Sequence, residues 1–128
     1  MKIYTSYFAK LKVLPPNIVP IAICTKVPFW YKGLHYPKLA PKYDFFIQWK
    51  KDHDNARFTE HYRREVLDGL NLVDVLSELR QLAPGKDIAL ICYEKPSDFC
   101  HRHIISDWFN QWLGICSIWV EGDIIEWK

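Results

Sequence analysis

The short segment between residues 92 and 103 holds the side chains of this chain that are most able to do chemistry. They are two cysteines, a glutamate, two histidines and an arginine: Cys92, Glu94, Cys100, His101, His103 and Arg102. Thiols, carboxylates and imidazoles serve as nucleophiles and general bases, and a guanidinium pairs with phosphate or carboxylate groups. Packing alone rarely gathers so many reactive groups, so we predict a functional site here.

Two regular elements are expected to position this segment. Residues 88–92 form a short apolar run rich in branched side chains, which is typical of a buried strand. Residues 99–113 carry apolar side chains at helical spacing from Ile104 to Phe109. The reactive groups therefore lie between the end of a strand and the first turn of a helix.

The start of that helix favours a reactive thiol. The positive end of the helix dipole and the cation of Arg102 both stabilise a Cys100 thiolate, and His101 can act as its base or proton shuttle. Glu94 can orient His101 or act as a general base. We therefore predict Cys100, His101 and Glu94 as catalytic residues, while Arg102 and the helix N-terminus bind an anion.

Several of these residues also have a purely structural interpretation. A cysteine at the end of a buried strand, such as Cys92, is commonly a small apolar packing residue, although we predict that it faces Cys100 and contacts the ligand. Cys100 can likewise be a packing residue. Glu94 can form an ion pair with Arg102, because a glutamate is rarely buried without a partner.

Zinc is a further alternative for the same segment. Thiol and imidazole ligands are present, on Cys92, Cys100, His101 and His103. Their spacing matches no common zinc motif, and adjacent Cys and His side chains are expected to point apart on a helix. We therefore predict no metal site, and the residues do not define a cofactor.

The remaining chain has the pattern of an α/β domain. Strands are expected at residues 2–7, 18–24, 87–93 and 116–121, and helices at 43–51, 56–70, 72–82 and 99–113. Asn71 is expected to cap the third of these helices. This order predicts one domain over residues 1–128, a small Rossmann-like three-layer fold. It should have a mostly parallel sheet of about four strands with helices on both faces.

Parallel sheets bind ligands at the carboxyl ends of their strands. This rule places Tyr7, Lys26 and Cys92 at one edge, beside the first turn of the last helix, so Tyr7 and Lys26 join the predicted ligand-binding residues. Residues 25–42, rich in proline and aromatic side chains, follow the second strand. They form either a lid, in which Trp30 stacks on a ring of the ligand, or a plug at the end of the core.

Composition excludes several classes of protein. Apolar residues make up 49% and aromatic residues 16% of the chain, so it can fill a core and is not disordered. The net charge of +2 does not by itself favour nucleic acid. No apolar run approaches the roughly 18 residues that span a bilayer, and the N-terminus lacks a signal-peptide pattern. We therefore expect a cytoplasmic protein with reduced thiols and no membrane partner.

The segment LICYEKPSDFCHRHIISDW resembles the signature of domain-of-unknown-function family 488 (DUF488), in which a Cys-x-Glu follows a strand and a Cys-His-Arg opens a helix. The resemblance extends through YTSY, WYKGLHYPKLAPK and FTEHYRREVL to a short subgroup found in bacteria and phages. It implies a compact cytosolic α/β domain with no settled activity. The implied site comprises five residues, Cys92, Glu94, Cys100, His101 and Arg102.

One departure from the family pattern concerns the second strand. Many members of the family have Asp-Val-Arg after that strand, whereas this chain has Ile23-Cys24-Thr25-Lys26. If the family's Asp and Arg bind a ligand, this protein uses Lys26 instead or acts differently.

Two functional hypotheses follow from the residues. The first is a small enzyme, or a binding protein, for an anionic small molecule such as a nucleotide or a phosphorylated metabolite. The second is a non-catalytic module for nucleic acid or protein, whose Cys and His residues are structural or bind zinc. Its contacts would come from aromatic and basic residues, namely Trp30, Tyr31, Lys32, Arg63 and Arg64.

Overall fold

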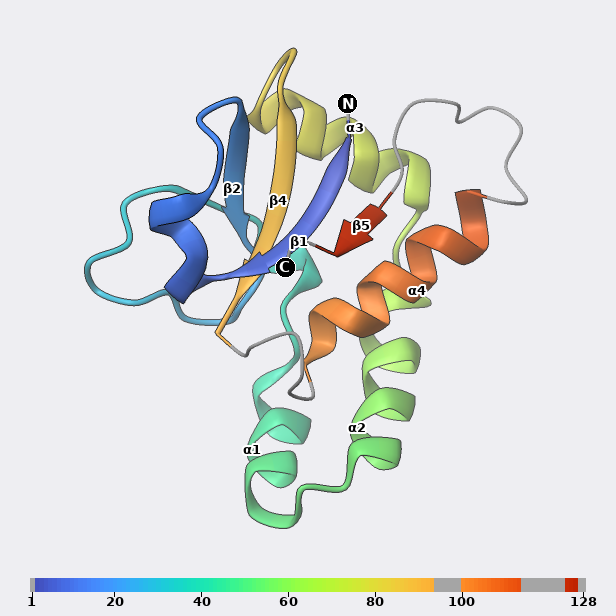
Figure 1. Cartoon of the computed structure of the whole chain (residues 1–128). Helices are drawn as coiled ribbons and strands as arrows, with labels where there is room; N and C mark the ends of the chain where they lie inside the picture. The colour runs from blue at the N-terminus through green and yellow to red at the C-terminus, as the bar shows by residue number, and fades with distance from the viewer. Residues whose placement is uncertain (1, 94–99, 114–123, 127–128) are drawn as a thin grey trace.

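The computed structural model describes residues 2–93, 100–113 and 124–126 (Figure 1). Its strands are β1 (Ile3–Tyr7), β2 (Ile18–Ala22), β3 (Leu34–His35), β4 (Asp87–Cys92) and β5 (Ile124–Glu126). Its α-helices are α1 (Tyr43–Asp52), α2 (Asn55–Tyr62), α3 (Leu72–Leu82) and α4 (His101–Leu113). Shorter helical segments are the 3₁₀-helices η1 (Phe8–Val13) and η2 (Pro37–Leu39) and the π-helix η3 (Arg63–Leu67).

The strands form one sheet in the order β3-β2-β4-β1-β5, and every pair is parallel. The predicted parallel α/β fold is therefore confirmed, with two short strands added at the edges. The short strand β5 pairs parallel to β1 at one edge of the sheet. The predicted strand at 116–121 lies outside the described residues.

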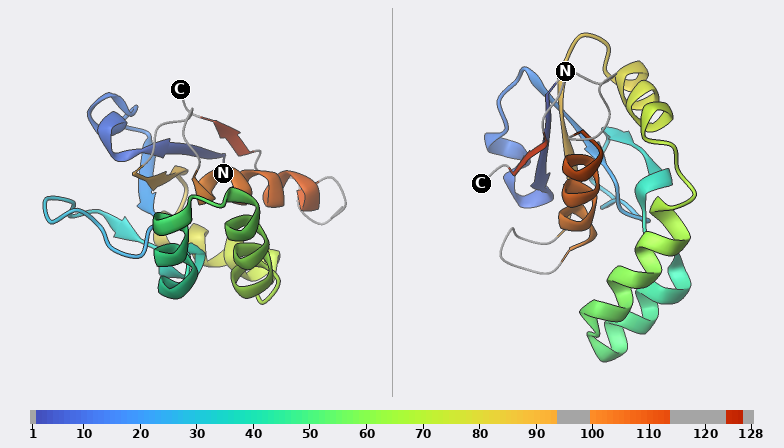
Figure 2. Two further views of the ribbon diagram at one scale, coloured as in Figure 1. Left: turned by 90° about the horizontal axis from the view of Figure 1, so that it is seen from below. Right: turned by 90° about the vertical axis from the view of Figure 1, so that its right-hand side faces the viewer.

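Helices cover both faces of the sheet, which gives the predicted three layers. On one face, Ile3, Ile88 and Leu90 pack in a common core with apolar residues of α3 and α4. On the other face, Ala89 and Ile91 pack with Phe8 of η1 and with other apolar side chains. The alternation from Ile88 to Ile91 places successive side chains on opposite faces. The right-hand view of Figure 2 shows α3 and η1 on opposite sides of the strands.

The predicted cap of α3 is also confirmed. The Asn71 side chain accepts hydrogen bonds from the backbone N–H groups of Val73 and Asp74, at 2.9 and 3.2 Å. The apolar stripe of α3 is buried, as its spacing predicts, at Leu72, Val75, Leu76 and Leu79. Within the described residues, no helix is long and apolar enough to cross a membrane.

The helix expected at residues 56–70 is present but not uniform. It begins as α2 and continues as the π-helix η3, in which the Asp68 N–H donates to the Arg63 carbonyl at 2.8 Å. The wider turn keeps Val66 and Leu67 in the core.

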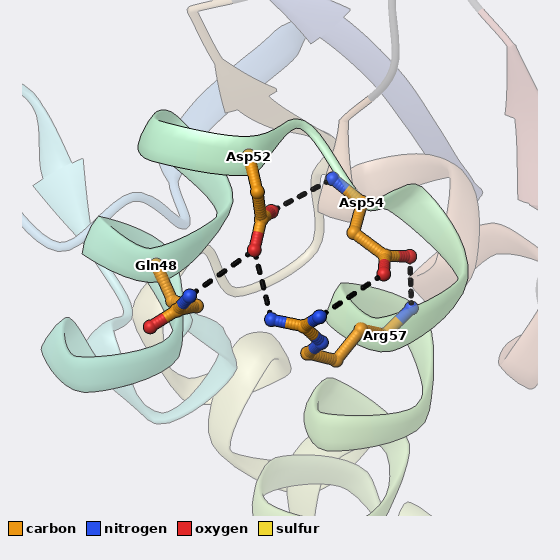
Figure 3. Close-up of polar contacts among 4 residues, drawn as sticks. All are labelled: Gln48, Asp52, Asp54 and Arg57. Atoms are coloured by element: carbon orange, nitrogen blue, oxygen red, sulfur yellow. Dashed lines mark hydrogen bonds and ion pairs between the residues drawn. The ribbon is translucent and has the colours of Figure 1, made fainter.

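A compact polar network joins α1 to α2 (Figure 3). The Asp52 carboxylate accepts hydrogen bonds from Gln48 Nε2, the Asp54 backbone N–H and Arg57 Nη1, at 3.1, 2.9 and 2.8 Å. The Asp54 N–H bond, followed by the Gln48 bond, lowers the pKa of Asp52. Asp54 caps α2 by accepting from the Arg57 N–H at 3.0 Å. This network fixes the angle of the α1–α2 hairpin, which extends below the sheet in Figure 1.

The aromatic side chains of segment 25–42 divide into a buried pair and an exposed pair. Tyr31 and Tyr36 are buried, as expected of a plug, whereas Phe29 and Trp30 are exposed. Burial raises the pKa of Tyr31 to about 12. The Tyr31 hydroxyl donates to the Leu34 carbonyl at 2.6 Å. Tyr31 is therefore a core residue of the plug, while the lid and the binding module stay predictions.

Candidate active site at the carboxyl edge of the sheet

The candidate site lies where β1, β2 and β4 end. Tyr7 pairs with Cys92 in the β1–β4 register, and the Ile23 N–H donates to the Ile91 carbonyl at 3.0 Å just beyond β2. The neighbouring strands therefore carry Tyr7, Ile23 and Cys92 to the same edge, as a parallel sheet requires. The N-terminus of α4 meets this edge at Cys100 and His101.

Three reactive side chains converge there: Cys92, Cys100 and His101, called here the Cys–His cluster. His101 Nδ1 is 3.6 Å from Cys92 Sγ and 3.8 Å from Cys100 Sγ, and the three atoms lie within 4.8 Å of one another. His101 Nε2 donates to the Ile23 carbonyl at 2.8 Å, because a carbonyl can only accept. That bond directs Nδ1 at the two sulfurs.

The convergence of neighbouring Cys100 and His101 differs from the sequence expectation. Adjacent Cys and His side chains would point apart if both were helical, but α4 begins at His101 and Cys100 precedes it. Cys100 therefore has the backbone freedom to turn its sulfur toward the imidazole. The Tyr62 ring packs edge-on against His101, with a centroid separation of 5.6 Å, and holds the imidazole in place.

Two opposing influences act on the pKa of Cys100. Burial raises it, whereas hydrogen bonds with Cys92 and His101, the charge of His101 and the backbone N–H of Arg102 lower it. The lowering influences prevail, and the pKa lies well below the usual range of a thiol. The cluster therefore favours a Cys100 thiolate beside an imidazole, which is the arrangement of an activated thiol nucleophile.

Arg102 and Tyr7, both predicted to bind ligand, contact each other. The Arg102 side chain is fully buried, and its Cζ lies 5.6 Å from the centre of the Tyr7 ring. A cation over an aromatic face is a stabilising contact. Arg102 thus packs below the start of α4, while its backbone N–H acts on Cys100.

The Cys–His cluster opens into a pocket of about 540 Å³, called here the thiol pocket. The pocket is lined by aromatic side chains, namely Tyr43, Phe46, Trp49, Phe58 and Tyr93. It is also lined by Cys24, Lys26 and Lys50, together with all three residues of the cluster. Lys26 and Cys92, two of the predicted ligand-binding residues, are therefore brought together with Cys100 and His101.

The predicted basic residue Lys26 is well anchored by its backbone. Its carbonyl accepts from the Tyr93 hydroxyl at 2.6 Å and from Cys24 Sγ at 3.4 Å. Its side chain is exposed at the pocket. A second lysine, Lys50 of α1, lies with Nζ 5.1 Å from the centre of the Phe46 ring, which places its ammonium group on the aromatic wall.

The α1–α2 hairpin residues of the pocket were not among the predicted site residues. Phe46, Trp49 and Lys50 come from α1 and Phe58 from α2, and the Trp49 and Phe58 rings are 5.9 Å apart. Phe46 and Trp49 are partly buried against the main core and also line the pocket, so their apolar character alone does not distinguish them from core residues.

Three of the predicted ligand-binding residues, Tyr7, Trp30 and Arg102, do not line the described part of the thiol pocket. Trp30 packs edge-on against Phe8, with ring centroids 5.9 Å apart, and is half exposed. Glu94 lies outside the described residues.

The fold and the cluster define a small parallel α/β protein with a thiol–imidazole site at the carboxyl edge of its sheet. The family model DUF488-N3a, described as the active DUF488-N3 subclade, matches residues 11–113. The chain belongs to this DUF488 family, which confirms the resemblance of the Cys-His-Arg segment. No curated protein and no solved structure matches the chain.

Proposed function

We propose that the protein is a thiol-dependent enzyme that acts on an anionic, ring-bearing small molecule such as a nucleotide. The observation that carries the proposal is the composition of the thiol pocket, which combines reactive groups, aromatic walls and two lysines. Its volume of about 540 Å³ suits a ligand of nucleotide size. The description of the matching family as an active subclade agrees with an enzyme.

In this proposal Cys100 is the nucleophile. Its sulfur forms a bond to an electrophilic atom of the substrate while the bond to the leaving group breaks. His101 Nδ1, 3.8 Å from Cys100 Sγ, takes up the thiol proton and then gives it to the leaving group, which departs with the electron pair. Water then cleaves the covalent intermediate and restores the thiol. The Ile23 carbonyl keeps His101 oriented throughout.

The preference for an anion rests on the charges around the pocket. Lys26 and Lys50 line it, and none of the described lining residues is acidic. A smaller groove of about 370 Å³ between α1 and α2 has an excess of acidic residues. Asp44, Asp52, Asp54 and Glu65 line it beside the basic residues Lys42 and Arg57. An anion is therefore expected to prefer the thiol pocket, where its ring can pack on Phe46 or Trp49.

The role of Lys50 can be tested by charge reversal with a neighbouring control. We expect Lys50→Glu to weaken the binding of nucleoside phosphates by about tenfold or more, since it places a carboxylate on the pocket wall. Lys51→Glu changes the net charge equally but lies outside the lining of the pocket. Affinities are measured by calorimetry at fixed salt. Equal weakening by the two variants, or no weakening by either, would contradict the proposal.

A further inference from the structure

The Cys–His cluster has the spacing of a metal site. In tetrahedral zinc, bonds of about 2.3 Å to sulfur and 2.0–2.1 Å to nitrogen place S and N about 3.6 Å apart. The separations from His101 Nδ1 to Cys92 Sγ and Cys100 Sγ are 3.6 and 3.8 Å. The two sulfurs, which lie about 3.8 Å apart around tetrahedral zinc, are within 4.8 Å of each other here, so a zinc ion fits between the three atoms after a shift of about 1 Å or less.

The surroundings of His101 match those of a zinc-bound histidine. A metal-ligating imidazole usually donates its second N–H to a carbonyl or carboxylate, which fixes the ring and its tautomer. His101 Nε2 donates in this way to the Ile23 carbonyl at 2.8 Å, so Nδ1 is the ligating atom. Because Ile23 follows β2 and Cys92 ends β4, the sheet itself holds the site.

Burial and charge also favour a divalent ion. Cys92, Cys100 and His101 are exposed by only 3%, 3% and 5%. Two thiolates and a neutral imidazole around Zn²⁺ have no net charge, so the complex avoids the cost of a buried charge. All three residues line the thiol pocket, which leaves the fourth coordination position facing it. Zinc with three protein ligands keeps a fourth position that water or a small ligand can occupy.

We propose that Cys92, Cys100 and His101 bind a zinc ion whose fourth coordination position opens into the thiol pocket. Both sulfurs bind as thiolates and His101 binds through a neutral Nδ1, so any proton still carried by the cluster is released on binding. The consequence for activity rests on the proposed function: zinc occupies the Cys100 sulfur, so it blocks the nucleophile reversibly. Metal binding itself does not depend on that function.

Cobalt and zinc binding to the chelator-treated full chain tests the proposal. We expect one equivalent of Co²⁺ to give the thiolate-to-metal charge-transfer and visible bands of a tetrahedral site, and one equivalent of Zn²⁺ to remove them. Cys92→Ser should weaken zinc binding by more than about 100-fold, beyond the 10–100-fold typical of an outer-shell change. Cys24→Ser is the control, because Cys24 is also buried at the pocket but lies outside the cluster.

Two results would overturn the zinc site. One is a wild-type cobalt complex without thiolate bands, a result that does not depend on whether any variant folds. The other is equal weakening by Cys92→Ser and Cys24→Ser. Ligand binding and thiol labelling are measured on metal-free protein. A negative zinc result therefore does not affect the proposed function, and a negative result for ligand binding or labelling does not affect the zinc site.

Discussion

Replacing Cys100 by alanine is expected to remove the chemistry of the protein while leaving its fold intact. For any substrate that the metal-free protein turns over, kcat should fall by about 10³-fold or more, the scale seen when a nucleophile is deleted. The same variant should lose the fastest-reacting thiol in iodoacetamide labelling followed by mass spectrometry. The reason is local: Cys100 receives hydrogen bonds from His101 and the Arg102 N–H, and it lines the pocket.

Two matched variants separate this role from simple packing. Cys24→Ala removes another buried thiol of the pocket and should leave turnover and the fast labelling phase unchanged. In Cys92→Ala, Cys100 should remain the fastest-labelled thiol. The rate of its labelling should change, because His101 loses one of its two neighbouring sulfurs. Turnover by Cys100→Ala within tenfold of wild type would exclude Cys100 as the nucleophile.

Arg102→Ala is expected to lower the free energy of unfolding by about 2–5 kcal/mol, the range for truncating a large buried side chain. Arg102 is fully buried and stacks on Tyr7, so its removal leaves a cavity and takes away a cation–π contact. Urea denaturation followed by circular dichroism measures the change. The ligand-binding role expected from the sequence stays a prediction, and the burial of Arg102 predicts a role in stability as well.

Arg64→Ala is the control for Arg102→Ala. Arg64 is exposed on the helical hairpin and forms a surface ion pair with Glu60 at 3.2 Å, so its removal should change stability by less than about 1 kcal/mol. Arg102→Lys keeps the charge and most of the stem but loses the guanidinium over the Tyr7 ring, so its loss of stability should lie between those of the two alanine variants. If Arg102→Ala lowers the free energy of unfolding by no more than Arg64→Ala does, the buried contact contributes nothing to stability.

Local patterns were sufficient to predict the elements that carry the site. The apolar run that ends at Cys92 predicted β4. The Asn71 cap predicted α3, together with the helical spacing of Leu72, Val75, Leu76 and Leu79. These features depend on near neighbours in the chain, so sequence reveals them. The general rule that parallel sheets bind ligands at the carboxyl ends of their strands predicted that the end of β4 lies beside the start of α4.

Long-range contacts were not predictable in the same way. Nothing in the sequence around Lys50 indicates that α1 folds back to form one side of the pocket. Its position depends on the angle between α1 and α2, across which Asp52 and Arg57 form an ion pair. The burial of Arg102 depends on the position of Tyr7, far away in sequence. The convergence of Cys100 and His101 depends on one residue, because the helix begins after Cys100 rather than before it.

Protection of Cys100 from alkylation tests the central claim most directly. Metal-free protein is labelled with iodoacetamide in the presence of nucleoside phosphates, the parent nucleosides or inorganic phosphate, and each cysteine is followed by mass spectrometry. We expect a ring-bearing phosphate to slow labelling of Cys100 by at least about tenfold and to raise the Tm, with weaker effects of nucleoside or phosphate alone. A ligand that raises the Tm but leaves Cys100 labelling unchanged, or a panel in which none protects Cys100, would contradict the thiol pocket as the functional site.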